Sequence, residues 1–331
     1  MDKMSVRQAS QCLGAAQRIL VICHIRPDGD AIGSLLGLGL ALQAAGKSVQ
    51  MVCADGVPAS LRHLDGSQQI IDQPKGEFDA ICVVDCSDLK RTGNVLDGHP
   101  QPDINIDHHI TNLEFARINL IDAEAVSTTQ ILADMLPELG LPITESVASA
   151  LLNGLVTDTI GFRTPNVTPF TLRLAAELME KGANLPELYF RSLVGRSFEA
   201  ARLWGAGLSQ LQKEGRVVWC ALTRADRKAA GYPGKDDADL VNVLSAIEDT
   251  EIAIVIVEQN ASKVKVSWRS QGNIDVAQVA MQFGGGGHPA AAGAEIQLPM
   301  QEAIPMILEA TQSALAQPLL PAALPNIILQ K

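Results

Sequence analysis

The sequence has little aromatic content and no pattern that would pair its cysteines. Only 4% of the 331 residues are aromatic, and each of the six cysteines stands alone, without a C-x-x-C pair or a histidine at zinc-finger spacing. A zinc finger is therefore excluded, and the cysteines are predicted to be reduced thiols in the core of a cytoplasmic protein. The apolar run at residues 19–23 is too short for a signal peptide or a membrane span, so we expect no membrane segment.

The chain also lacks an excess of positive charge. Its formal net charge is −11 and its sequence pI is near 5.0. Proteins that hold long nucleic acids neutralise many phosphates with Lys and Arg, so the charge argues against long duplex nucleic acid as a partner. A short anionic substrate is compatible with this charge, and so is a carboxylate cluster that binds divalent cations.

Chain length and hydrophobic periodicity predict an α/β protein with two domains, because 331 residues exceed the size at which one core usually keeps growing. In the first half, short apolar runs alternate with helical patterns, which indicates a parallel sheet with strands at residues 19–24, 49–53, 80–85 and 104–107. Residues 31–45 are predicted to form a glycine-rich helix packed closely on this sheet. Further helices are expected at residues 127–139, 144–156 and 168–181, with Ser127, Thr144 and Thr168 as N-caps.

The second half predicts a smaller α/β domain. Its expected strands lie at residues 216–222, 251–258 and 263–269, and its expected helices at 238–247 and 274–281. We therefore expect an N-terminal domain at residues 1–185, a helical connector at 186–205 and a C-terminal domain at 206–331, with a cleft between the domains. The proline-rich tail from residue 317 is predicted to be an extension without chemistry.

The first group of chemically active residues is His24, Asp28 and Asp30, placed where the first strand ends and a helix begins. In open α/β sheets, ligands bind outside the carboxyl ends of the strands. Mixed nitrogen and oxygen donors at such a turn suit Mn²⁺ or another divalent ion. An Asp before a helix is commonly an N-cap, and Asp30 is the better candidate for that role, which leaves His24 and Asp28 for another.

Three further segments bring acids or imidazoles to the ends of elements. Asp85 ends a hydrophobic strand, the triplet Asp107-His108-His109 ends another, and Asp158 follows an apolar helical stretch. Each signal is weak alone, because a strand-terminal Asp or an Asp-His-His triplet is common in ordinary turns. Together the carboxylates would repel one another at one sheet edge unless cations lie among them, so the cluster predicts metal.

These motifs resemble those of the DHH phosphoesterase superfamily, in the expected order along the chain. The later run Gly284-Gly285-Gly286-Gly287-His288, preceded by Ser267-Trp268-Arg269-Ser270, resembles the companion domain called DHHA1. Length and domain pairing look most like the nanoRNase and pAp-phosphatase group, called NrnA. The glycine run departs from the family pattern in being four residues long and in being followed by Pro289, where a polar or basic residue often stands.

The resemblance implies two Mn²⁺ ions, for which Mg²⁺ or Co²⁺ could substitute. One ion would be held by His24 and Asp28, the other by Asp30, His108 and Asp158, and Asp85 would bridge both. Catalytic roles fall to Asp85, to Asp107 as the residue that orients His108, and to His109 as the contact to the phosphate. The family attacks with water, so no covalent serine or cysteine intermediate is needed.

The second domain is expected to bind the substrate. Consecutive glycines let backbone amides approach an anion, so Gly285, Gly286 and Gly287 form a candidate phosphate nest, although a flexible turn explains such a run as well. Arg269 and His288 add donors for the far phosphate or terminal nucleotide. Arg163 either lines the same cleft or is an ordinary exposed arginine. Trp268 and Phe283 could stack on a base, but core packing is the favoured interpretation.

The leading functional hypothesis is a two-metal phosphoesterase that hydrolyses oligoribonucleotides a few residues long and also 3′-phosphoadenosine 5′-phosphate (pAp). Two alternatives stay open: a phosphodiesterase for cyclic or linear dinucleotides, and a non-catalytic nucleotide sensor. A pyrophosphatase is disfavoured by the DHHA1-like run. The expected partners are short RNA or small phosphorylated nucleotides, with a homodimer as a possible assembly.

Overall fold

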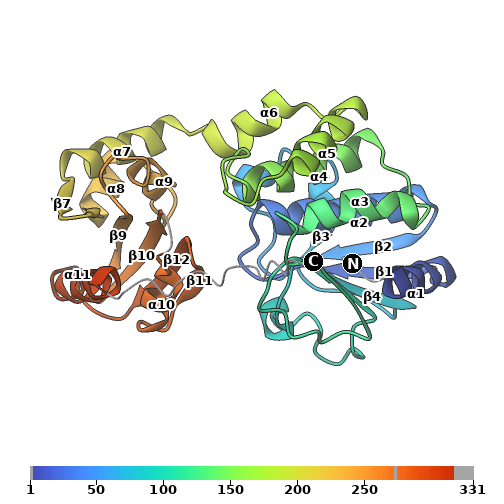
Figure 1. The fold of residues 1–331 in the computed structure, drawn as a ribbon. Helices are drawn as coiled ribbons and strands as arrows, with labels where there is room; N and C mark the ends of the chain where they lie inside the picture. The colour runs from blue at the N-terminus through green and yellow to red at the C-terminus, as the bar shows by residue number, and fades with distance from the viewer. Residues whose placement is uncertain (1–2, 272–273, 317–331) are drawn as a thin grey trace, which may run out of the picture. The chain divides into compact units, whose positions relative to one another are not determined.

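The computed structural model describes residues 3–271 and 274–316, and the chain divides into two compact units between Gly195 and Arg196 (Figure 1). This division falls inside the segment expected to be a connector. The first part of that segment, with the buried Leu188, packs into the core of the first unit, whereas Leu203 packs into the second. The proline-rich tail from residue 317 lies outside the described residues.

The first unit is built on a six-stranded parallel sheet in the order β3-β2-β1-β4-β5-β6. Its strands are β1 (Arg18–Ile22), β2 (Ser48–Val52), β3 (Ile70–Ile71), β4 (Ala80–Val84), β5 (Ile104–Asp107) and β6 (Ile118–Ile121). The prediction of an α/β fold with a parallel sheet is confirmed, and β3 and β6 add edge strands that the sequence did not predict. After β1 the chain builds outward through β2 and β3, then returns to place β4 on the other side of β1. Such a reversal of strand order creates a switch point at the carboxyl ends of β1 and β4.

The helices of the first unit are α1 (Lys3–Ala15), α2 (Gly29–Ala44), α3 (Thr128–Glu138), α4 (Glu145–Asp158), α5 (Pro169–Glu180) and α6 (Leu185–Tyr189), and a π-helical turn follows at Phe190–Val194. The predicted N-caps Ser127, Thr144 and Thr168 are confirmed, since each hydroxyl accepts a backbone N–H of the following turn. The predicted cap of α2 was wrong. Asp28, not Asp30, accepts the N–H groups of Asp30 and Ala31.

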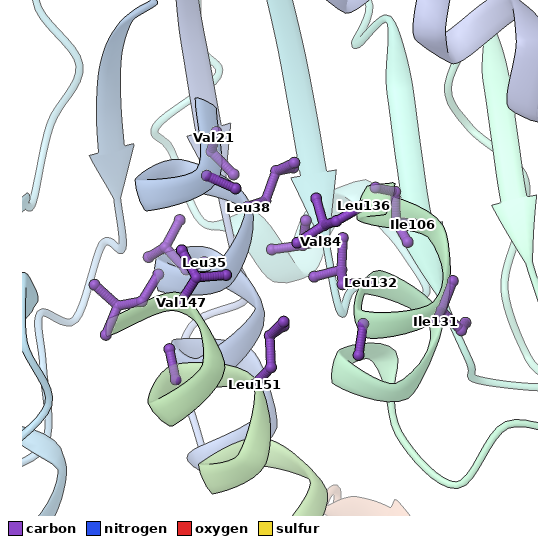
Figure 2. Close-up of a cluster of buried hydrophobic side chains, with 14 of the residues drawn as sticks. Val21, Leu35, Leu38, Val84, Ile106, Ile131, Leu132, Leu136, Val147 and Leu151 are labelled. Atoms are coloured by element: carbon purple, nitrogen blue, oxygen red, sulfur yellow. The ribbon is translucent and has the colours of Figure 1, made fainter. Parts of the chain in front are cut away.

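The core of the first unit follows the two-residue period of its strands. On β1, Ile19 and Val21 face a large cluster formed with the helices, whereas Leu20 and Ile22 face a smaller cluster on the opposite side. Figure 2 shows Leu35 and Leu38 of α2 packed with side chains from the sheet and from helices α3 and α4.

The glycines of α2 allow its close packing. A Cβ at Gly39 would lie 2.3 Å from the sulfur of Met51 on the sheet, as the sequence predicted. Gly33 and Gly37 instead face α4, where a Cβ would lie 2.6 Å from the carbonyl oxygen of Ala150 and 2.5 Å from the side chain of Leu151. The glycine-rich helix is therefore fitted to a second helix as much as to the sheet.

The second unit contains a mixed six-stranded sheet in the order β11-β12-β10-β9-β8-β7, in which only β8 and β9 pair in parallel. Its elements are α7 (Phe198–Ser209), β7 (Gln212–Glu214), β8 (Val217–Leu222), α8 (Arg224–Ala230), α9 (Leu240–Leu244), β9 (Ile252–Asn260), β10 (Lys263–Ser270), α10 (Val276–Met281), β11 (Gly286–His288), β12 (Ala291–Ile296) and α11 (Met300–Ala316). Alternate residues of β9 face different clusters: Ile254 packs on the side of α10 and α11, and Val255 on the side of α7 to α9. The predicted smaller α/β domain is confirmed. Across the described part of the chain, no helix is long and apolar enough to cross a membrane.

Candidate active site

Polar residues follow the ends of three neighbouring strands of the first unit. His24 lies two residues beyond β1, Asp85 directly follows β4, and His108 and His109 directly follow β5. Because parallel strands end at the same edge of a sheet, these side chains meet at the switch point between β1 and β4. His24 and Asp85 are 3% and 1% exposed, so these two side chains are shielded from water.

Two helices supply the remaining carboxylates. Asp28 and Asp30 stand at the start of α2, and Asp158 is the last residue of α4. The two helix ends can approach closely because Gly29 has no side chain. A Cβ there would lie 2.2 Å from the hydroxyl oxygen of Thr157. Asp28 divides its two oxygens between two tasks: Oδ1 caps α2, and Oδ2 lies 4.0 Å from Nε2 of His24.

The structure brings the six predicted metal ligands into linked groups whose donor atoms lie within 4.8 Å of one another. One group is His24, Asp28 and Asp85, and another is Asp30, His108 and Asp158. Asp85 connects the two, because its Oδ2 lies 3.5 Å from Nε2 of His24 and its Oδ1 lies 3.8 Å from Nε2 of His108. A third group joins Asp85 with His108 and His109.

The pKa values of the carboxylates show the electrostatic conflict in this cluster. Burial and the charge of Asp85 raise the pKa of Asp30 to about 7. Burial and the charge of Asp30 also raise the pKa of Asp158 well above its ordinary value. Carboxyl groups that are buried together in this way favour either a proton or a cation. The donor set of imidazole nitrogens and carboxylate oxygens suits a divalent transition-metal ion.

The histidines respond in the opposite direction. Burial opposes a charge on His24, but its hydrogen bond to Asp85 and the charges of Asp85 and Asp28 outweigh burial and raise its pKa to about 9. The pKa of Asp85 is lowered, because the three histidines together overcome the effect of its burial. The three histidines thus favour the ionised form of Asp85 at the centre of the cluster.

Asp107 contacts the second histidine of the triplet, which corrects one expected role. Its Oδ1 lies 2.7 Å from Nδ1 of His109 and accepts the backbone N–H of His108 at 2.9 Å. The ring of His108 instead has its Nδ1 3.4 Å from the carbonyl oxygen of Ala125. Asp107 thus orients the ring of His109 and not that of His108, because the two rings have different partners and their planes differ by 63°.

Three residues that the sequence did not single out complete this site. The side-chain amide of Asn112 donates to Oδ2 of Asp107 at 2.6 Å. Thr128 and Thr129 donate to Asp30 and Asp85 from the start of α3. In the sequence, the threonines look like the first turn of a helix and Asn112 like a loop residue, so no local signal links them to carboxylates that precede them by up to 99 positions.

In the second unit, structural reasons account for part of the glycine run. Gly284 has a φ of +73°, and a Cβ at Gly285 or Gly287 would lie 2.2 Å or 2.4 Å from a carbonyl oxygen of strand β12. Gly286 begins the edge strand β11, which pairs with β12. These contacts explain why glycine is needed here, and the phosphate-binding role of Gly285, Gly286, Gly287 and His288 stays a prediction.

The other candidate substrate residues differ in burial, from the exposed Arg163 through the half-buried Arg269 to the buried Trp268. Arg269 is held by Asn242, whose Oδ1 accepts its Nε–H at 2.9 Å, and Arg163 is exposed in the loop after α4. Trp268 is fully buried, with its indole N–H bonded to Thr311 and its ring stacked on Phe283. Core packing of Trp268, the favoured interpretation, is confirmed. Phe283 is partly buried against the same core cluster.

Two family models match this chain in the order of its two units. The model of the DHH family, N-terminal domain, matches residues 18–155, and the model of the DHHA1 domain matches residues 211–317. The fold and the site therefore place the chain in the DHH and DHHA1 class. It is 36% identical over 306 residues to the bifunctional oligoribonuclease and PAP phosphatase NrnA of Thermus thermophilus, with 90% of each chain covered. The chain belongs to the NrnA family, which confirms the resemblance seen in its motifs.

Solved structures share the fold of this chain. An exopolyphosphatase-related protein from Bacteroides fragilis has 26% sequence identity and a TM-score of 0.87, covering 94% of this chain and 96% of that chain. RecJ of Thermus thermophilus, solved in complex with Mn²⁺, has 18% identity and a TM-score of 0.56, covering 95% of this chain and 55% of that chain. At that identity the likeness to RecJ extends to the fold alone.

Proposed function

We propose that this protein is a divalent-metal-dependent phosphoesterase that hydrolyses short oligoribonucleotides and pAp. The observation that carries the proposal is the position of Asp85 between two groups of metal-ligand type, at the switch point of the sheet. The 36% identity to an oligoribonuclease and PAP phosphatase supports the substrate class. Reduced, singly placed cysteines fit an enzyme of the cytoplasm.

The proposed metal is Mn²⁺ at two sites, with Mg²⁺ or Co²⁺ as substitutes. His24 and Asp28 would hold one ion, Asp30, His108 and Asp158 the other, and Asp85 both. When bound, such ions lower the pKa of water and neutralise charge on the phosphoryl oxygens. The surrounding chain excludes bulk water from Asp30 and Asp85, both 1% exposed.

His109 is the proposed contact to the scissile phosphate. Although burial opposes a charge on this ring, the hydrogen bond to Asp107 raises its pKa and fixes its orientation. A protonated imidazole donates a hydrogen bond to an anionic phosphoryl oxygen. Arg269, His288, Gly285, Gly286, Gly287 and Arg163 are proposed to bind the other end of the substrate.

A substrate panel tests the proposal directly. Purified protein with Mn²⁺ or Mg²⁺ is incubated with a labelled diribonucleotide, pAp, a cyclic dinucleotide, pyrophosphate and a long RNA. We expect release of mononucleotide from the diribonucleotide and of phosphate from pAp, with little action on pyrophosphate or long RNA. Binding without any turnover would favour the sensor, and preference for the cyclic dinucleotide would favour the other phosphodiesterase.

The same panel with Arg269→Gln separates binding from chemistry. If Arg269 binds the substrate, KM rises while kcat changes less, because uniform binding is lost. Arg216→Gln is the matched control, since this exposed arginine pairs with Glu251 at the sheet end. Equal kinetics for Arg269→Gln and Arg216→Gln would refute the role of Arg269 in substrate binding.

Asn112→Ala tests the orientation of His109. Losing the amide donor to Asp107 leaves that buried carboxylate with one partner fewer, so kcat is expected to fall by about 10- to 100-fold, because a misplaced His109 would contact the reacting phosphate less well. Asn94→Ala, at an exposed asparagine, is the control and should keep full activity. Unchanged kcat in Asn112→Ala would show that the Asp107 and His109 pair does not depend on it.

A further inference from the structure

The start of helix α3 contacts two of the buried carboxylates at once. Asp30 accepts the backbone N–H groups of Thr128 at 2.7 Å and Thr129 at 3.0 Å, and its Oδ1 also accepts the hydroxyl of Thr129 at 2.7 Å. The hydroxyl of Thr128 donates to Oδ1 of Asp85 at 2.9 Å. Both threonines are fully buried.

These contacts are not required to cap the helix. The N-cap is Ser127, whose hydroxyl oxygen accepts the N–H of Gln130 at 3.0 Å. The hydroxyls of Ser127 and Thr129 lie 2.9 Å apart, so Ser127 can donate to Thr129 while Thr129 donates to Asp30. Each threonine hydroxyl thus donates its hydrogen to a carboxylate, Thr128 to Asp85 and Thr129 to Asp30.

The arrangement offsets the cost of burying Asp30 among other acids. A helix N-terminus presents unpaired N–H groups and a positive potential, and a carboxylate there is stabilised in its charged form. Asp30 Oδ1 receives two donors from Thr129, and Oδ2, which receives one from Thr128, is the oxygen that lies 4.0 Å from Nε2 of His108. The donors therefore orient the carboxylate toward the histidine of its own group.

Thr128 also links the two groups. Its backbone N–H bonds to Asp30 and its hydroxyl to Asp85, so a single rigid residue fixes the distance between carboxylates that belong to different groups. β-branched side chains have few χ1 rotamers, which makes threonine a stiff spacer. The fit around Thr129 is equally tight, because a Cβ at Gly154 would lie 2.4 Å from its methyl carbon.

We propose that Thr128 and Thr129 are positioning residues that set the spacing and orientation of Asp30 and Asp85 for metal binding. This inference rests on the proposed function, because it assumes that the two carboxylates bind a divalent ion. Both threonine side chains are fully buried. They act through the carboxylates, and the direct measure of their role is the affinity of the protein for metal.

The test measures Mn²⁺ binding to the purified protein by calorimetry, without substrate. Thr128→Val and Thr129→Val keep the shape and the backbone donor and remove the hydroxyl. Each is expected to raise the dissociation constant for Mn²⁺ by about 10- to 100-fold, the usual range for residues that support metal ligands. Thr128→Ser and Thr129→Ser keep the hydroxyl and should stay within a few-fold of wild type.

Thr250→Val is the matched control, because this buried hydroxyl donates to the carbonyl of Ile247 in the second unit. Wild-type affinity in both valine variants would overturn the proposal, as would equal losses in the serine and valine variants. If a valine variant fails to fold by circular dichroism, the Thr→Ala variant takes its place under the same criteria. A wild-type protein that binds Mn²⁺ and hydrolyses nothing in the panel would refute the proposed function alone.

Discussion

Asp85→Asn is expected to lower turnover by at least about 10³-fold, because in the proposed site Asp85 is shared by two metal ions, and losing such a ligand costs several kcal/mol of transition-state stabilisation. The amide keeps the shape of the carboxylate, so Thr128 can still donate to its oxygen. What is lost is the negative charge that faces His24 and His108. The measurement is the rate of mononucleotide release from a diribonucleotide with saturating Mn²⁺, together with the number of Mn²⁺ ions bound per chain.

Asp88→Asn provides the control for this prediction. It makes the same chemical change three positions later, where Asp88 caps a short 3₁₀ turn and asparagine caps equally well. Thermal unfolding followed by circular dichroism should stay cooperative in both variants. Turnover by Asp85→Asn close to that of Asp88→Asn would refute the bridging role of Asp85.

The proposed ligands at strand ends could be predicted to lie together because a parallel sheet gives its strand ends a common location. A hydrophobic run followed at once by an acid or a histidine identifies His24, Asp85 and His108 as neighbours, even though they are distant in the sequence. The position of the strand ends does not decide which of Asp28 and Asp30 caps α2. Both residues fit a helix start, and only the structure shows that Asp30 faces inward to α3 while Asp28 caps α2.

Residues that act through tertiary contacts carried no such signal. Thr128, Thr129 and Asn112 belong to polar types that are common at helix starts and in turns. Their roles depend on partners brought close by the fold, such as Asp30 for Thr129 and Asp107 for Asn112. In the second unit, likewise, the sequence of the glycine run is compatible with a phosphate nest or a turn. Its close contacts with β12 depend on a strand that the sequence did not predict.

The packing of α2 against α4 connects the fold to the site. Gly33 and Gly154 allow the two helices to approach, and this approach brings Asp30, on α2, to Thr129 and Asp158. Helix propensity alone would favour alanine at both positions by about 1 kcal/mol. The presence of glycine is therefore explained by the space that the site needs.

Gly154→Ala is expected to destabilise the protein by about 1 to 3 kcal/mol despite the better helix propensity of alanine, because it overpacks a filled interior. The added Cβ would lie 2.4 Å from the methyl carbon of Thr129 and 2.8 Å from Oδ1 of Asp30. Since the carboxylate must shift, the affinity for Mn²⁺ should fall as well, by about 10- to 100-fold. Denaturant unfolding and calorimetric titration with Mn²⁺ measure the two effects.

Gly14→Ala is the matched control, because a Cβ at that helical position meets nothing within 4 Å, and it should stabilise the protein slightly. A double variant locates the collision. Thr129→Ser removes the methyl group nearest to the new Cβ and keeps the hydroxyl that bonds to Asp30. In combination with Gly154→Ala it should therefore recover part of both losses, a coupling that a double-mutant cycle measures. If the effects of the two substitutions are simply additive, the absence of a Cβ at Gly154 is not what allows Thr129 to bond to Asp30.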